Sequence, residues 1–569
     1  MGDLLGADFA LAHKETLYRC LDKLLVHKAG LFSFLQQRWK SLFGADFEVL
    51  LYDLTSTYFE CDPPAAGKRR FGYSRDKRSD CVQSLPRAKA LRHSHILLAP
   101  TRFAVIQEPQ GMILGAAVAR SKCVLGDVRR EERAIWLLDR IVGSGSLKPR
   151  EFGQTRAGEM AAHRLLSSDD FEPTALLVPH VARTAAACHG RRVVAAQDTS
   201  EINFDRSRRP AAGLGPTGNR DIRGFFLHPL VAVDADAETL LGVAGARIWT
   251  RGEEPTPDHA QIPFDEKESR RWLEAAELAA SHLAPVAAGV IVVADREGDI
   301  YPMFARCPET VDLVVRATHD RILASGGTLF AAPAAWPLLG SAQVKVTAKR
   351  PGGKDRTAAV AIKAGTVTLK RPRGTIDRSD PAALTLGLVE VREATAPEAA
   401  GKPLLWHLLT TLPVATLADA QEVVRLYRLR WRIEQVFRIM KSDGFDIEDS
   451  QLETATRLMN LAALALVAAA RTIQLVDARD GSARPATDVI APEEIEAAAA
   501  ISAALEGATE RQKNPHEMGS LAWLSWIAAR LGGWNCYYKP PGPKTMARGC
   551  DRLIDRIAGY RLATGPPNV

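Results

Sequence analysis

Apolar runs and amphipathic patterns alternate in the middle of the chain. Apolar runs of four to ten residues bounded by turn residues are typical of buried strands, and they predict four strands, at residues 193–196, 225–233, 240–249 and 289–295. Between the third and fourth runs, residues 267–284 place apolar side chains at helical spacing and predict an amphipathic helix. The first strand runs into Asp198 and the fourth ends at Asp295, so two carboxylates follow two predicted buried strands.

The pattern changes on both sides of this region. β-branched residues alternate with others in SAQVKVTAKR and TAAVAIKAGTVTLKR, which predicts a β-rich insertion over residues 310–415. A helix is predicted from Asp419 to Met440, and an apolar helix over 458–475. Helical patterns also dominate residues 124–187 and the chain after 477. The predicted fold class is therefore α/β, a mixed sheet flanked by helical N-terminal and C-terminal regions.

The composition is that of a globular protein made of several domains. The chain has 569 residues, of which 46% are hydrophobic and 25% charged. Its net charge of +7 and pI near 8.9 favour a polyanionic partner. The longest apolar stretch, residues 461–470, is shorter than the roughly 18 residues that cross a bilayer, and the first residues lack the pattern of an export signal. We therefore expect a cytoplasmic protein without a membrane segment.

One helical segment carries an unusual set of polar side chains. In YRLRWRIEQVFRIMK, at about 100° per residue, a stripe about 60° wide holds Tyr427, Arg430, Glu434 and Lys441. The apolar side chains occupy the neighbouring arc and would hold the helix against a core; they are Leu426, Ile433, Phe437 and Met440. All four polar groups can therefore face one ligand. A glutamate among arginines is also typical of a surface ion-pair network, which is the alternative interpretation.

The two aspartates and the glutamate are the ligand types of a divalent metal centre. Phosphodiester cleavage and strand transfer need charge neutralisation around an in-line displacement, and two metal ions held by several carboxylates provide it. Asp198 and Asp295 at strand ends and Glu434 on a helix are the candidate catalytic and metal-binding residues. Oxygen ligands and phosphate substrates favour Mg²⁺, or Mn²⁺ in its place.

Three ordered motifs carry a family resemblance. The spacing Tyr-x2-Arg-x3-Glu-x6-Lys, with QDTSEINF around Asp198 and ADREGDIY around Asp295, resembles insertion-sequence transposases of the IS-four family, Tn-five type, in the DDE superfamily. The likeness covers roughly residues 123–569. It implies an RNase H-like catalytic domain interrupted by a β-rich insertion before the glutamate. It also implies a helical N-terminal DNA-binding domain and a C-terminal helical region that pairs two subunits.

The resemblance implies a DNA transposase with cut-and-paste chemistry. Metal-activated water nicks the element end, the freed 3′-hydroxyl attacks the opposite strand to form a hairpin, and the opened end later joins target DNA. The implied partners are double-stranded DNA, as transposon end repeats and as target, and a second copy of the chain in a homodimer on that DNA. The implied location is the bacterial nucleoid. By matched motif position, the residues that would grip phosphates around a base turned out of the stack are Tyr427, Arg430 and Lys441.

Three further residues have alternative interpretations. Trp406 matches the aromatic residue of the insertion that stacks on the extruded base, or it is an interior tryptophan of the insertion. Arg296 is a candidate DNA contact, with a structural ion pair to Glu297 or Asp299 as the alternative. His228 lies within an apolar strand and is typical of a core histidine with satisfied hydrogen bonds.

The changes of pattern and the resemblance together divide the chain into parts. These are a truncated transposase-like fragment (1–95), a linker (96–122), a helical DNA-binding domain (123–188), the two halves of the RNase H-like core (189–309 and 416–476), the β-rich insertion (310–415) and a C-terminal helical region for dimerisation and DNA contact (477–569). The first fragment, with LLYDLTSTYFE and GYSRDKRSDCVQ, resembles the opening catalytic strand of another branch of insertion-sequence transposases. Asp53 in this fragment lacks the later carboxylates of that branch and is not expected to be a ligand.

Two other functions remain open from the sequence. A stand-alone RNase H-like endonuclease would use the same fold and the same carboxylates. A catalytically inactive DNA-binding remnant would keep the fold without the chemistry. The intact tyrosine, arginine, lysine and tryptophan set favours transposition over the first alternative, and the intact carboxylates favour activity over the second.

Overall fold

The computed structural model describes most of the chain after residue 124. It covers residues 125–564, with gaps at 145, 205–210, 219–221, 253–261, 347–355, 374–377, 394–402, 442–444, 483, 491 and 538. Before residue 125 it describes three short strands and the single residues His27, Gly30 and Phe34. The chain falls into two compact units, Met1–Gln107 and Glu108–Val569.

The first unit contains a small antiparallel sheet. Its strands are β1 (Thr57–Phe59), β2 (Arg69–Phe71) and β3 (Val82–Ser84), and β3 lies between the other two. Asp53 and the linker expected over 96–122 lie outside the described residues.

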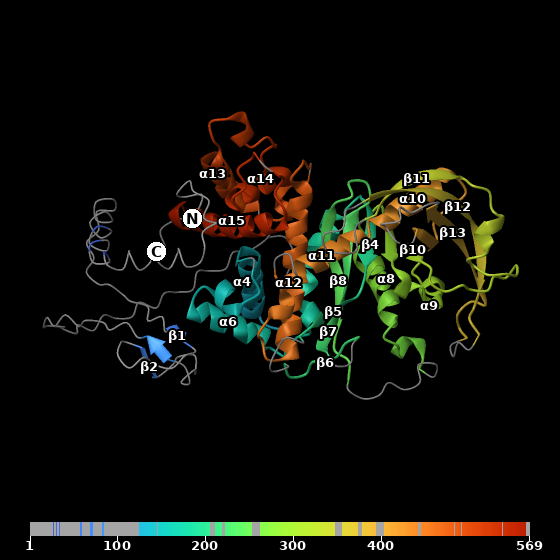
Figure 1. The fold of residues 1–569 in the computed structure, drawn as a ribbon, viewed down its shortest axis with the longest axis horizontal. Coiled ribbons are helices and arrows are strands. Elements are labelled where there is room, and N and C mark those ends of the chain that lie inside the picture. Colours follow the sequence, from blue (N-terminus) through green and yellow to red (C-terminus); the bar gives the residue numbers. More distant parts are fainter. Residues whose placement is uncertain are drawn as a thin grey trace. The chain divides into compact units, whose positions relative to one another are not determined.

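Five strands of the second unit form the centre of one mixed sheet. They run in the order β8 (Leu240–Trp249), β7 (Arg223–Asp234), β4 (Arg192–Gln197), β9 (Gly289–Ala294) and β10 (Asp312–Arg316). β4, β9 and β10 are parallel to one another, whereas β7 is antiparallel to both β4 and β8. The four strands predicted from the apolar runs are therefore confirmed, and so is the mixed α/β class (Figure 1).

Further strands extend this sheet on both sides. Beyond β10 come β14 (Leu405–Thr410), β13 (Ala383–Glu393), β12 (Arg356–Lys370) and β11 (Gly340–Val346), all antiparallel to their neighbours. On the other side, β5 (Ser200–Asn203) and β6 (Gly215–Pro216) pair with β7, and the apolar pattern did not predict them. The alternating segments after residue 340 thus form strands, while β10, from the range expected for the insertion, continues the parallel centre of the sheet.

Helices cover both faces of this sheet. One face carries α8 (Arg270–His282) and α9 (Tyr301–Ala305); the other carries α10 (Leu417–Arg428), α11 (Trp431–Lys441) and α12 (Ala455–Ala478). Because successive side chains of a strand point to opposite faces, Val193 and Ala195 of β4 pack in the core with α8. Val194 and Ala196 pack in the core with α11 and α12. Both faces of β4 are therefore buried, as its uninterrupted apolar run predicts.

α12 connects the sheet to the remaining helices of the unit (Figure 1). These are α4 (Val128–Ser144), α5 (Pro149–Gly153), α6 (Arg156–Leu166) and α7 (Val178–Ala187) before the sheet, and α13 (Ile495–Leu505), α14 (Leu521–Leu531) and α15 (Pro543–Thr564) after it. Among the described residues, α12 is the one helix long and apolar enough to span a membrane by composition. Since 89% of its apolar window is buried inside the structure, α12 has the surroundings of a core helix.

The segment before α12 forms two helices, so the prediction of one helix from Asp419 to Met440 was wrong. α10 begins with a capping box in which the Thr416 hydroxyl accepts from the backbone of Asp419 (3.2 Å) and the Asp419 carboxylate accepts from the backbone of Thr416 (2.9 Å). After α10, the N–H groups of Leu429 and Arg430 each donate to the carbonyl three residues back, at 3.1 Å. This tighter turn separates α10 from α11. Tyr427 therefore lies on a different helix from Glu434, and the single straight stripe does not exist.

Candidate active site

Asp198 and Asp295 follow two adjacent parallel strands. Ala196 of β4 lies opposite Val293 of β9 in the sheet, and each aspartate comes two residues later in its chain. Because parallel strands end at the same edge of a sheet, the fold brings the two carboxylates to neighbouring positions. Their charges interact, since Asp295 is one of the groups that raise the pKa of Asp198.

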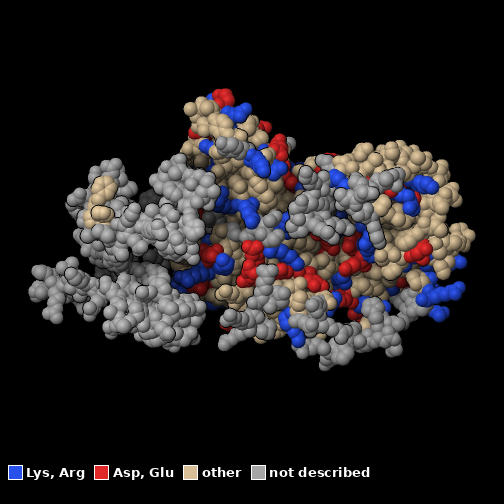
Figure 2. Space-filling model, in the orientation of Figure 1, with Lys and Arg blue, Asp and Glu red and all other residues tan. Residues whose placement is uncertain are grey.

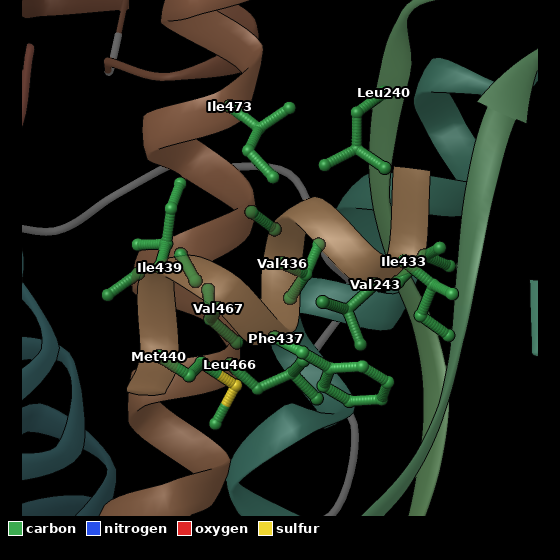
Figure 3. Close-up of a cluster of buried hydrophobic side chains, with 14 of the residues drawn as sticks. Leu240, Val243, Ile433, Val436, Phe437, Ile439, Met440, Leu466, Val467 and Ile473 are labelled. Carbon is green, nitrogen blue, oxygen red and sulfur yellow. The ribbon is translucent and has the colours of Figure 1, made fainter. Parts of the chain in front are cut away.

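Glu434 is held in place by the apolar face of its helix. Figure 3 shows this face packed against β8 and α12. The buried side chains of α11 are Ile433, Val436, Phe437, Ile439 and Met440, and they contact the core that includes Leu240 and Val243 of β8 and Leu466, Val467 and Ile473 of α12. Three residues of the predicted apolar arc, Ile433, Phe437 and Met440, lie on this face and are buried, whereas the fourth, Leu426, is buried on α10. The opposite face of α11 carries Glu434 toward the end of β4.

Arg430 joins two of the three candidate ligands. Its Nη1 lies 2.5 Å from Asp198 Oδ2, and its Nη2 lies 3.2 Å from Glu434 Oε1. Only 14% of the side chain is exposed for both Arg430 and Asp198. The carboxylates from β4 and α11 therefore share one largely buried cation, although they are 236 positions apart in the sequence.

Burial shifts the pKa values of this group because it disfavours the charged form of each side chain. It raises the pKa of Asp198 to about 7 against the opposing effect of Arg430, and the negative charges of Asp295 and Glu434 raise it further. Burial also disfavours the charged form of Arg430, but Asp198, Tyr427, Glu434 and Asp295 outweigh it and raise the pKa of the guanidinium above its usual range. The site therefore requires a cation, and in this structure Arg430 supplies it.

A cavity of about 390 Å³ opens beside these groups. Its lining comes from the end of β4, from β5 and from α11: Asp198, Thr199, Ser200, Trp431, Glu434, Phe437, Arg438 and Lys441. Within the described residues, no three side chains of His, Cys, Asp or Glu stand close enough together to hold a metal ion. The donor set nevertheless suits Mg²⁺ or Mn²⁺, because Asp198, Asp295 and Glu434 offer only oxygen atoms and carry mutually repelling charges. In this structure the guanidinium of Arg430 contacts two of these three carboxylates, Asp198 and Glu434.

Tyr427 lies beside Trp406 and a cation that sequence reasoning missed. The rings of Tyr427, on α10, and Trp406, on β14, meet edge to face with their centroids 5.1 Å apart. Arg316, at the end of β10, makes a hydrogen bond to Tyr427 and donates to the carbonyl of Leu405 (3.2 Å). Burial lowers the pKa of Arg316, and the charges of Arg296 and Arg430 act in the same direction. A signal was available, since Arg316 ends an apolar run, DLVVR, as the aspartates do.

Lys441 and Arg296 lie at the margins of this arrangement. Lys441 Nζ donates to the backbone carbonyl of Glu201 and lies 3.2 Å from Glu448 Oε1, so it is fastened to β5 and not to the carboxylates. Arg296 is exposed. Its two proposed ion-pair partners have other cations, because Arg271 pairs with Glu297 (2.8 Å) and Arg321 pairs with Asp299 (2.6 Å).

Comparison with known families identifies the sheet and the helix that carries Glu434. Residues 221–471 match the family model of the transposase DDE domain. This part of the chain is therefore similar to a transposase DDE domain. The matched range extends from the start of β7 into α12 and includes Asp295 and Glu434, whereas β4 and Asp198 precede it. A DDE domain indicates a transposase, a metal-dependent endonuclease that acts in DNA transposition and recombination, and the mixed sheet agrees with its RNase H-like fold.

The described surface around the DDE domain carries charges of both signs. In Figure 2, basic and acidic side chains lie next to one another over the face shown. Partly exposed ion pairs of this unit include Arg192 with Glu422 (2.5 Å) and Arg251 with Glu268 (2.7 Å). The described part of the face shown is therefore not uniformly basic.

Proposed function

We propose that the chain is a DNA transposase of the IS-four family, Tn-five type, in which Asp198, Asp295 and Glu434 bind the metal and carry out catalysis. The observation that supports this most strongly is the shared cation, because Arg430 contacts the carboxylates of both Asp198 and Glu434. Bound Mg²⁺ or Mn²⁺ would activate water and stabilise the charge that develops at the scissile phosphate. The matched DDE domain supports this reaction class.

The cations and aromatic rings near the carboxylates suit the DNA backbone and an extruded base. Once an ion neutralises the carboxylates, Arg430 is free to bind a phosphate beside them. Tyr427 and Trp406 offer aromatic faces for a base turned out of the stack. Arg316 places a further cation beside that aromatic pair. We propose that Lys441 and Arg296 contact phosphates at the margins of the cavity.

The remaining parts of the chain would supply DNA recognition and pairing. We propose that the helices within residues 123–188 bind the transposon ends, and that the helices within 477–569 pair two subunits on DNA. α12 contacts helices from both regions, which supports a role in joining them to the catalytic sheet. The protein would act on the nucleoid in the bacterial cytoplasm.

The direct test is cleavage of the DNA that encloses the gene. A supercoiled plasmid that carries the gene with its flanking inverted repeats is incubated with the purified full chain and Mg²⁺ or Mn²⁺. The proposal predicts excised element, hairpin ends that run at twice the strand length on a denaturing gel, and joined products with a second plasmid. EDTA should abolish all three. Nicking without hairpins or joined products would favour a stand-alone endonuclease, and binding without cleavage would favour an inactive remnant.

Binding of Mn²⁺ to the protein is expected to weaken about tenfold between pH 8 and pH 6. The pKa of Asp198 is raised to about 7, so roughly nine tenths of this carboxyl is ionised at pH 8 and about one tenth at pH 6. Because the ion binds the carboxylate and not the acid, affinity follows this fraction. Electron paramagnetic resonance of free Mn²⁺ measures it. Asp198→Asn should bind weakly at both pH values, and equal affinity of the unmodified chain at both would contradict the assignment.

A further inference from the structure

A buried chain of hydrogen bonds lies behind Asp198. His228 of β7 is buried, with its Nε2 3.0 Å from Gln197 Oε1 and its Nδ1 2.8 Å from Thr199 Oγ1. Its ring also meets Trp272 of α8 edge to face, with the centroids 4.7 Å apart. The prediction of a core histidine with satisfied hydrogen bonds is therefore confirmed. Gln197 and Thr199 flank Asp198 in the sequence, so one imidazole contacts both neighbours of this aspartate.

Arg271 of α8 connects this chain to the turn that follows Asp295. Its Nε donates to Thr199 Oγ1 (2.9 Å), and its Nη2 donates to Glu297 Oε2 (2.8 Å). Arg271 is only 9% exposed, so its guanidinium is largely shielded from water, whereas its partner Glu297 lies at the surface. One guanidinium therefore contacts both Thr199, which follows Asp198, and Glu297 in the turn capped by Asp295.

The residues that Arg271 contacts are the ones that orient the two aspartates. The backbone N–H of Thr199 donates to Asp198 Oδ1 (2.8 Å). The backbone N–H of Glu297 donates to Asp295 Oδ1 (2.9 Å). The position of each carboxylate thus depends on a backbone group whose own side chain is held by Arg271.

The donors and acceptors of this chain fit only one arrangement. Gln197 Oε1 can only accept, so the neutral ring of His228 donates from Nε2, and its Nδ1 accepts the hydroxyl hydrogen of Thr199, whose oxygen accepts from Arg271. Burial, together with the charges of Arg271 and Arg247, holds the pKa of His228 well below its usual range, which keeps the ring neutral. The chain of hydrogen bonds therefore has one arrangement of donors and acceptors.

We infer that Arg271, Thr199 and His228 form a bracket that sets the spacing of the two aspartates for metal binding. All three are positioning residues, because their side chains contact the neighbours of the aspartates and not the aspartates themselves. Partners of this kind typically contribute ten- to hundredfold to metal affinity, since they hold the ligands in the required geometry. The inference rests on the proposed function, because the ion is its ligand.

Thr199→Val tests the bracket by removing one hydroxyl while preserving the shape of the side chain. The expected result is Mn²⁺ binding weakened by about ten- to hundredfold at pH 8, measured by paramagnetic resonance without DNA. Thr199→Ser keeps the hydroxyl and should restore the affinity. Thr472→Val is the control, because it makes the same change at a buried threonine whose hydroxyl donates to Ala468 O (3.0 Å) within α12, away from the aspartates. It should bind Mn²⁺ as the unmodified chain does.

Arg271→Lys and the double variant separate a shared mechanism from general damage. Lysine keeps the charge but loses the fork that reaches Thr199 and Glu297 at once. If both residues act through one bracket, the double variant Thr199→Val with Arg271→Lys should bind Mn²⁺ no more than about twofold more weakly than the weaker single variant. If the loss of Mn²⁺ affinity in the double variant equals the product of the two single losses, the two residues act independently and the inference is wrong.

A surface substitution covers the case in which Thr199→Val does not fold. Glu297 is 65% exposed, so Glu297→Gln weakens the far end of the bracket without altering a buried residue, and it should lower Mn²⁺ affinity severalfold. Unchanged affinity in either Thr199→Val or Glu297→Gln would overturn the inference while leaving the proposed function intact. If the unmodified chain and Asp198→Asn bind Mn²⁺ equally, the proposed metal site is contradicted. The inference about the bracket is then contradicted as well.

Discussion

Glu434→Gln is expected to reduce DNA cleavage at least about a thousandfold while leaving DNA binding intact. The substitution removes one of three candidate ligand carboxylates, and stabilisation of transition-state charge by a bound ion is worth several kcal/mol, at about 1.4 kcal/mol per factor of ten in rate. Glutamine keeps the size of the side chain and an oxygen for Arg430, which lies 3.2 Å from Glu434 Oε1. Single-turnover cleavage of end DNA gives the rate, and a gel shift gives the binding.

The matched control for this loss is Glu453→Gln. Glu453 is exposed and lies just before α12, so the same chemical change there should leave cleavage within about twofold of the unmodified chain. A Glu434→Gln protein that cleaves within tenfold of the unmodified chain would show that Glu434 is not a metal ligand.

Ile433→Ala is expected to weaken the packing of α11, the helix that carries Glu434, against the sheet. Ile433 is fully buried between β8 and α12 (Figure 3), and truncation of such a residue costs about 2–5 kcal/mol through lost burial and the cavity left behind. Amide hydrogen exchange in peptides from α11 should become about thirtyfold faster or more, because roughly 1.4 kcal/mol corresponds to a factor of ten in local opening. Cleavage should fall with it, since Glu434 is the next residue.

Ile433→Val provides the graded comparison. It removes one methylene and should cost about 0.5–1.5 kcal/mol, with a correspondingly smaller change in exchange. Peptides from β12 and β13, at the far side of the sheet, should exchange at unchanged rates in both variants. Equal exchange of α11 in Ile433→Ala and the unmodified chain would show that this apolar face does not anchor the helix.

The central strands were predictable because their periodicity is set by burial. β4 and β9 are covered on both faces, so their residues are uniformly apolar and end abruptly at Gln197 and Asp295. The side of α11 that faces the core was predictable for the same reason, since Ile433 and Phe437 recur at helical spacing. In each case a local pattern reflects a local environment.

Other features depend on contacts between distant residues and leave no local pattern. No proline or glycine marks the break after α10; Arg430 sits there and reaches Asp198, 232 positions away. The run DLVVR does not indicate that Arg316 makes a hydrogen bond to Tyr427, because that contact arises only when β10 lies beside β14. β5 was missed because its residues are mostly half-buried and partly polar, so its strand conformation comes from pairing with β7.

Lys441 shows how a correct helical position can still mislead. It lies at the end of α11 as predicted, but its ammonium group is held by Glu201 and Glu448 and not by the carboxylates that share Arg430. Spacing along a helix predicts which residues share a face. It does not predict which neighbouring element supplies their partners.

Anomalous diffraction from crystals of the full chain with end DNA and Mn²⁺ would test the metal centre most directly. The expected result is Mn²⁺ bonded to carboxylate oxygens of Asp198, Asp295 and Glu434 at about 2.0–2.2 Å, with the Arg430 guanidinium moved onto a phosphate. Crystals in which Mn²⁺ lies elsewhere, and Arg430 still bridges Asp198 and Glu434, would contradict the proposed catalytic site.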